Sequence, residues 1–178
     1  MEQGQFCFIV DEFYTVHDKE HKLMKNKESL DGKEHGRPCF YAFSDKKNPS
    51  ILWCVPISSQ VDKYTRIYNH KLDKQKEKGV KTPKCNTIRF GEVMGVKKAF
   101  LIQNMFPIID KYIGEIYINR LTQEAVRIPQ NTERDIVFYA ALSGGGLKTR
   151  ISDILQYKSS NLLSTSICCG YVLYTCNF

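Results

Sequence analysis

The sequence predicts an α+β fold built on a small, largely antiparallel β-sheet, with helices inserted and appended. Short apolar runs typical of strands concentrate in residues 6–129, whereas segments with helical periodicity lie between or after them. The chain has 178 residues, a length that suits one domain able to bury a core without disulfides or metals. No internal repeat or low-complexity linker divides it, so we expect a single domain over residues 1–178.

The N-terminal segment predicts a strand, a helix and a loop. Residues 6–10 (FCFIV) form an apolar run typical of a strand. Asp11 is the expected N-cap of an exposed helix that continues to about Glu28, because charges alternate along this stretch. Residues 29–38 contain two glycines and a proline, which predicts a loop.

A strand hairpin and a basic helix come next. Residues 40–45 and 50–57 predict two strands, and DKKNP between them predicts the turn. Residues 60–78 predict a helix with one apolar stripe, and Gly79 is its expected stop. The stripe consists of Val61, Tyr64, Ile67, Tyr68 and Leu72. Core packing is the simpler role for its two tyrosines, and contact with a ligand is the alternative.

Two further strands are expected in the middle of the chain. Residues 86–90 and 98–105 are apolar enough for strands, and GEVMG between them predicts a turn with glycine at each end. Pro107 is expected to end the second strand, and a short helix is expected around residues 108–113.

The C-terminal segments predict a short strand pair and two helices. Residues 117–119 and 125–129 are the expected pair. Residues 131–143 and 148–163 have helical patterns, and the glycines at 144–146 separate them.

Positive charge is concentrated in one segment. The chain holds 26 Lys and Arg against 19 Asp and Glu, a net charge of +7. Residues 62–98 contain eleven of the basic residues and four of the acidic ones, so they carry the whole net charge. Such a segment attracts a polyanion by Coulomb attraction and counterion release. The alternative is a solvated helix face in a basic protein.

The remaining composition excludes several classes. Seven cysteines without a CxxC pair predict reduced thiols in a cytoplasmic protein. His17 and His21 are four residues apart but lack a third ligand, so we expect no metal and no cofactor. The N-terminus does not resemble a signal peptide, and residues 167–174 are too short to span a membrane. Phosphate-binding P-loop, dinucleotide-binding and nucleophile-elbow motifs are absent from the sequence.

One polar cluster carries possible chemistry. Ser58 and Ser59 stand where a predicted strand ends and the basic helix begins. Hydroxyl and backbone N–H groups at a helix N-terminus can bind an anion, and Lys63 lies one turn further along. The alternative is that one of these serines only caps the helix.

Several runs of the sequence resemble the toxins of type III toxin–antitoxin systems, the ToxN/AbiQ family, and in particular its CptN-like branch. These runs are FIVDEFY, RPCFYAF, VPISSQVDKY and FLIQNMFPI with the following KYI. Their order and spacing carry the resemblance, which spans residues 6 to roughly 160. It implies a compact, strongly bent antiparallel sheet or barrel similar to the MazF/Kid-like ribonucleases, with inserted and C-terminal helices.

The same resemblance implies a function. It predicts a metal-independent, sequence-selective endoribonuclease that acts on cellular or phage mRNA in growth control and abortive phage defence. It predicts inhibition by a small repeated pseudoknot RNA antitoxin, in a protein–RNA hetero-oligomer in the cytoplasm without a membrane partner.

Matching the family's motifs residue by residue gives a candidate site. Tyr14 matches a functional tyrosine after the first strand, and Arg37 is the nearest match to a basic residue before the second. Ser58 and Ser59 match the hydroxyl pair. Lys63 stands two positions later than the lysine of the ToxN pattern.

The chemistry of RNA cleavage suits these residue types. The 2′-OH is the nucleophile, so the protein must stabilise negative charge on the phosphorane and move protons, giving 2′,3′-cyclic phosphate and 5′-OH ends. Arg37 and Lys63 are candidates to stabilise the charge, and the serines to position the phosphate. Tyr14 is a candidate to orient the 2′-OH or the leaving oxygen. His35 is either a general acid or base or a plain surface residue.

The basic segment is the expected track for substrate and antitoxin phosphates. Its expected RNA-contacting residues are Tyr64, Arg66, Lys71, Lys74, Lys78, Lys81 and Lys84.

Two other hypotheses for the function stay open. One is a non-catalytic basic RNA- or DNA-binding module. The other is a metal-dependent nuclease, which is disfavoured because acidic residues do not cluster near the serine motif.

Overall fold

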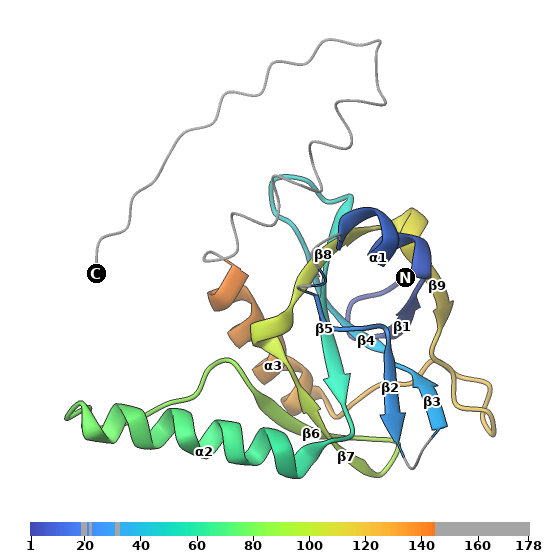
Figure 1. Cartoon of the computed structure of the whole chain (residues 1–178). Helices are drawn as coiled ribbons and strands as arrows, with labels where there is room; N and C mark the ends of the chain where they lie inside the picture. The colour runs from blue at the N-terminus through green and yellow to red at the C-terminus, as the bar shows by residue number, and fades with distance from the viewer. Residues whose placement is uncertain (19–20, 22, 31–32, 145–178) are drawn as a thin grey trace.

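The computed structural model describes residues 1–144 apart from residues 19, 20, 22, 31 and 32 (Figure 1). The strands of its main sheet are β1 (Phe6–Ile9), β4 (Cys39–Ser44), β5 (Ile51–Ser58), β6 (Arg89–Val93), β7 (Val96–Phe100), β8 (Phe106–Ile109) and β9 (Ile113–Ile116). They form an antiparallel sheet in the order β6-β7-β5-β4-β1-β9, and β8 pairs with β5 beside this path. A separate hairpin consists of β2 (Lys27–Leu30) and β3 (Lys33–Gly36).

The predicted antiparallel α+β architecture is confirmed, but the predicted barrel is wrong. Within the described residues, β6 pairs with β7 alone and β9 with β1 alone, so the sheet stays open at both ends. In the part of the chain that the structure describes, three α-helices accompany the sheet, namely α1 (Asp11–His17), α2 (Val61–Glu77) and α3 (Gln130–Gly144). None of the helices in the described part of the chain has the length and apolar character needed to cross a membrane.

Strand β5 is the centre of the molecule. All eight of its residues are buried, as its apolar sequence ILWCVPIS predicts. One edge pairs with β4, whereas the other edge pairs with β8 near Ile51 and with β7 near Ser58. The short 3₁₀ helix η1 (Ile102–Asn104) separates β7 from β8, so the chain leaves the edge of β5 and then returns to it.

Alternate side chains of β5 enter two different cores, as the two-residue period of a strand requires. Trp53 and Val55 pack in one core with Ile136 of α3. Cys54 packs in the other core with Phe13 of α1. A third core forms between α2 and the segment around β7, and α2 extends away from the sheet (Figure 1).

Helix α1 is much shorter than the predicted helix, which extended to about Glu28. Phe13 is its only buried residue, and the stretch after His17 is mostly polar, with Leu23 and Met24 packing against two different cores and not forming one apolar helix face. The N–H of Leu23 donates instead to the carboxylate of Asp18 at 2.9 Å. The predicted loop over residues 29–38 is also wrong, because most of it belongs to the hairpin of β2 and β3.

The predicted hairpin of β4 and β5 is confirmed, and Asp45 organises its turn by accepting N–H groups of Lys47 and Asn48. The next hairpin, β6 and β7, is shifted relative to the prediction. Its turn consists of Met94 and Gly95, which both have positive φ, at 52° and 75°. This is the backbone of a tight two-residue turn, so the strands continue through most of GEVMG.

Pro107 does not end a strand, since it lies within β8 opposite Trp53. In the described chain β5 is the only pairing partner of β8, so one edge of β8 makes no strand pairing. Such an edge position tolerates the missing N–H of proline. The 3₁₀ helix η2 (Asp110–Tyr112) and β9 replace the predicted short helix over 108–113.

The remaining predictions after β5 are mostly confirmed. Helix α2 ends before Gly79, whose φ is 76°, and α3 covers the predicted helix over 131–143. Ile118 and Ala125 form the bridge of the predicted short pair. The predicted helix over 148–163 lies outside the described residues.

Candidate functional site

Ser59 lies at the junction of two hollows. The antiparallel register pairs Ser58 of β5 with Ala99 of β7, which brings the neighbouring Lys98 beside Ser59. The ammonium of Lys98 donates to the hydroxyl of Ser59, with 2.5 Å between Nζ and Oγ. A cation and a hydroxyl are thereby fixed together where β5 ends and α2 begins.

The first hollow, which we call the hairpin pocket, has a volume of about 500 Å³. Its polar lining consists of His35, Ser59 and Lys98, the groups expected to handle a phosphate and a proton. The rest of its lining is Phe8, Gly36, Pro38, Ile57, Val93, Met94, Val96 and Tyr117. The pocket therefore has a cationic, hydrogen-bonding part and a larger apolar part.

The second hollow, which we call the helix pocket, has a volume of about 430 Å³ and lies at the start of α2. Its lining is Ser59, Gln60, Val61, Asp62, Lys63 and Arg66. Lys63 and Arg66 place two positive charges there, partly balanced by Asp62. Ser59 lines both hollows, with Lys98 in the first and with Lys63 and Arg66 in the second.

Ser58 has a structural role in this arrangement. Its side chain is 1% exposed, and its hydroxyl accepts the N–H of Gln60 at 3.1 Å. This bond closes the turn that leads into α2, and Ser58 does not line either hollow. Neither serine caps α2, whose N-cap is Gln60 without a side-chain cap bond, and of the two serines Ser59 faces the candidate site.

Arg37 is buried behind the site. Only 7% of the residue is exposed, and its guanidinium donates to two backbone carbonyls, that of Lys25 through Nε at 2.9 Å and that of Ile57 through Nη1 at 3.0 Å. Its own N–H donates to the carbonyl of Asn26 at 2.6 Å. Arg37 thus connects the segment before β2 to the end of β5, two residues before Ser59.

Tyr14 also lies behind the site, in the core that includes Phe13 and Phe106. Burial raises the pKa of its phenol well above the usual value of 10, although the positive charge of Arg37 acts in the opposite direction. The phenol therefore stays protonated near neutral pH and can donate a hydrogen bond, but it cannot serve as a base. It does not line either hollow.

His35, the candidate general acid or base, lies at the site. It is exposed on β3, in register with Glu28 of β2, and it lines the hairpin pocket with Ser59 and Lys98. The structure therefore brings together His35, Ser59 and Lys98, with Lys63 on the other side of Ser59.

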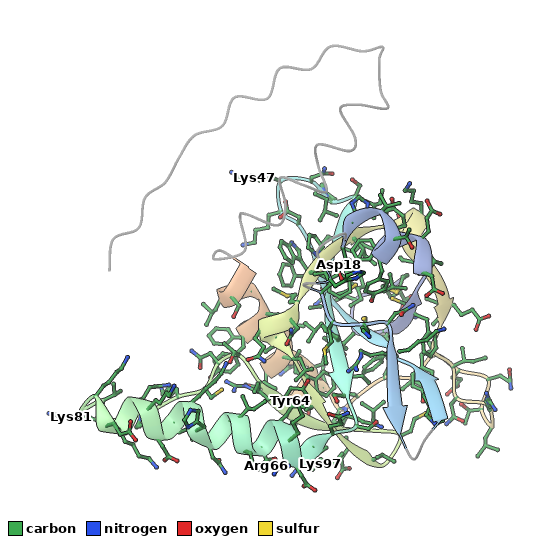
Figure 2. The ribbon with its side chains drawn as sticks, in the orientation of Figure 1. Asp18, Lys47, Tyr64, Arg66, Lys81 and Lys97 are labelled. Carbon is green, nitrogen blue, oxygen red and sulfur yellow. The ribbon has the colours of Figure 1, made fainter. Side chains whose placement is uncertain are left out.

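The predicted RNA-contacting residues divide into two groups. Arg66, Lys74, Lys78, Lys81 and Lys84 are exposed. Figure 2 shows Lys81 at the far end of α2 and Arg66 at the end near the sheet.

Two of these residues serve the protein itself. Lys71 donates to the hydroxyl of Thr87 at 2.7 Å and to the amide oxygen of Gln103 at 2.6 Å. Tyr64 is only 6% exposed and packs beside Leu101 and Ile88, so its predicted stacking with RNA is wrong. The simpler interpretation of its stripe, core packing, is the one that the structure supports.

Lys98 is the residue that sequence reasoning missed. It belongs to the basic segment, but its place at the site depends on the pairing of β5 with β7, which are separated by all of α2 and β6. The local signal for its orientation is the two-residue period of a strand, which puts Lys98 on the same face as Val96 and on the opposite face from Lys97.

The described residues contain no group of three or more His, Cys, Asp and Glu side chains arranged to hold a metal ion. Cys7, Cys39, Cys54 and Cys85 are buried free thiols, and a hydrogen bond with Cys7, together with burial, raises the pKa of Cys54 well above its usual value.

Searches of protein-family models and of curated proteins found no match to this chain.

Proposed function

We propose that this protein is the toxin of a type III toxin–antitoxin system, a metal-independent and sequence-selective endoribonuclease. The observation that carries the proposal is the contact between Ser59 and Lys98 inside a pocket shared with His35. The resemblance of the sequence motifs to the ToxN/AbiQ family supports it independently, since those motifs contain Ser59.

The proposed reaction is an internal transfer of the RNA phosphate. The 2′-oxygen attacks the adjacent phosphorus, the bond to the 5′-oxygen breaks, and the products are a 2′,3′-cyclic phosphate and a 5′-OH. Lys98 and Lys63 stabilise the extra negative charge of the phosphorane, and Ser59 orients one of its oxygens. His35 takes the proton of the 2′-OH or delivers one to the 5′-oxygen, and solvent water supplies or accepts the other proton.

Helix α2 is the proposed track for the rest of the RNA. Its exposed lysines follow the phosphates of the substrate strand and of a repeated pseudoknot antitoxin, which blocks the site by occupying it. A protein–RNA hetero-oligomer is the expected resting form. RNA sequencing of material that copurifies with the protein from its native locus tests this partner directly.

The decisive experiment is the incubation of the pure protein with total RNA, with and without EDTA, followed by mapping of the new ends. We expect cleavage in EDTA that leaves cyclic phosphate and 5′-OH ends, and loss of cleavage in Ser59→Ala and His35→Ala variants. Growth arrest on expression without the antitoxin is the expected cellular counterpart.

The second candidate is a basic RNA-binding protein without catalysis, which the exposed lysines of α2 also support. It predicts binding that weakens steeply with salt while the RNA stays intact. Cleavage that requires an added divalent cation would instead favour the metal-dependent nuclease.

A further inference from the structure

The apolar residues of the hairpin pocket have no role in the cleavage reaction proposed above. Phe8 and Tyr117 form its floor, with their rings edge to face at a centroid distance of 5.5 Å. Met94 and Val96 lie at its rim in the hairpin of β6 and β7, and they are 48% and 54% exposed. Large apolar side chains that stay open to solvent around a concave surface are typical of a binding site.

We propose that this apolar part binds one unpaired nucleobase of the RNA, next to the phosphate that Ser59 and Lys98 hold. This inference rests on the proposed function, and it adds the element that selects the cleavage sequence. The volume of about 500 Å³ falls within the range of small-molecule sites, so it accommodates a base together with its ribose.

The chemistry of the pocket matches a nucleotide better than a purely apolar ligand. A nucleotide has an anionic phosphate at one end and a flat aromatic base at the other. The lining of the pocket combines the bonded pair Lys98 and Ser59 with two aromatic rings and several aliphatic side chains. Unpaired RNA bases are commonly taken out of their stack and held against aromatic side chains.

The position of the pocket also gives the bound strand a direction. Ser59 separates the hairpin pocket from the helix pocket, where Lys63 and Arg66 lie. An RNA whose phosphate contacts Ser59 therefore extends along α2 on one side, and it places a base into the apolar part on the other. The basic side provides affinity that does not depend on sequence, whereas the apolar side provides selectivity.

The backbone of the β6–β7 turn supports a functional role for Met94. Its φ of 52° lies in the left-handed region, where glycine or asparagine is the usual choice. Met94 occupies this position although its side chain strains the turn and is 48% exposed. Strain of this kind is concentrated at ligand-binding positions, and here it directs attention to the thioether at the pocket rim.

The test combines cleavage with binding. Val96→Trp fills the pocket rim, Met94→Asn removes the thioether while suiting the turn, and Val80→Trp is the matched control on an exposed valine after α2. Rates are measured on a set of short RNAs that differ in one base beside the cleaved bond. We expect Val96→Trp to lower kcat/KM at least tenfold and Met94→Asn to reduce the base preference, with Val80→Trp unchanged.

A titration with nucleoside 3′-monophosphates and with inorganic phosphate, followed by NMR of the full chain, separates the two proposals. Nucleotide binding at least tenfold tighter than phosphate binding, and lost in Val96→Trp, supports the pocket even if the wild type cleaves no RNA. A wild type that cleaves RNA, together with a Val96→Trp variant of unaltered rate and base preference, overturns the base site alone. Equal affinity for phosphate and all four nucleotides overturns it as well.

Discussion

Lys98 and Ser59 face each other across the β7–β5 pair with 2.5 Å between Nζ and Oγ. Neither residue is close to the other in sequence, so the contact exists only when the sheet has formed. It places a positive charge on the one hydroxyl that both hollows share.

This contact predicts that Lys98→Met abolishes most of the RNA cleavage. The methionine keeps the length of the side chain but removes the ammonium, and loss of one such stabilising group typically costs about 100- to 1000-fold in kcat. The matched control is Lys97→Met, because Lys97 lies on the same strand, is exposed and does not line the pocket. Single-turnover cleavage assays compare the two variants. Equal losses in both would remove Lys98 from the proposed mechanism.

Arg37→Ala is expected to destabilise the fold by about 2–4 kcal/mol, because it removes a buried guanidinium that donates to the buried carbonyl of Ile57 and to the partly buried carbonyl of Lys25. The measurement is the urea dependence of unfolding. Arg66→Ala, at an exposed position, is the control and should stay within about 0.5 kcal/mol of the wild type. A wild-type unfolding midpoint in Arg37→Ala would show that the buried guanidinium contributes nothing net.

His17 predicts a loss of stability in mild acid. Burial, with the nearby Lys111, lowers the pKa of His17 from its usual value of 6.5, while Glu12 opposes the shift. Below about pH 6.5 the unfolded chain therefore takes up the proton before the folded protein does, and stability falls as the pH decreases further.

A variant isolates this contribution of His17. His17→Gln keeps a polar partner for the hydroxyl of Tyr112, which lies 2.9 Å from the imidazole, but cannot titrate. Urea midpoints at pH 7.5 and 5.5 should differ less in the variant than in the wild type. An unchanged difference would assign the acid sensitivity to other groups.

The exposed lysines on α2 and just after it predict a salt-dependent contribution to RNA affinity. Replacing Lys74, Lys78 and Lys81 by glutamine should weaken binding of a long RNA and reduce the slope of log K against log salt by about 2–3. Replacing Lys46 and Lys47, which are exposed in the β4–β5 turn, is the control, and Figure 2 shows Lys47 far from Lys81. Cleavage of a short RNA that reaches only Ser59 should be unaffected. Equal salt slopes in both variants would contradict a track along α2.

Local patterns were sufficient for the parts of the fold that depend on local sequence. The apolar run of β5 and the stripe and glycine stop of α2 predicted these elements almost to the residue. The stretch after His17 was predicted wrongly because its charged residues have good helix propensity but the stretch lacks a continuous apolar helix face that packing could bury. The break between β7 and β8 was also missed, since it depends on pairing with β5 and not on composition.

In the candidate site too, some residues could be predicted from local sequence, whereas others depend on strand pairing and packing. Ser59 and His35 could be identified from sequence because they belong to a motif or adjoin one. Lys98 required the register of β7, and the burial of Tyr64 required knowledge of which face of α2 meets the sheet. Arg37 was predicted to contact the substrate, but the structure places it beneath the site, bonded to carbonyls.

The bonds of Arg37 have a mechanical consequence for His35. His35 is carried by β2 and β3, a two-stranded ribbon outside the main sheet, and such a ribbon is at best marginally stable by itself. Arg37 directly follows that ribbon, and its guanidinium donates to the carbonyl of Ile57 near the end of β5. The guanidinium of Arg37, together with the backbone bond from the N–H of Ile57 to the carbonyl of Pro38, thus holds the end of the ribbon against β5. Removing the guanidinium would loosen the attachment of His35 while β4 and β5 stay paired.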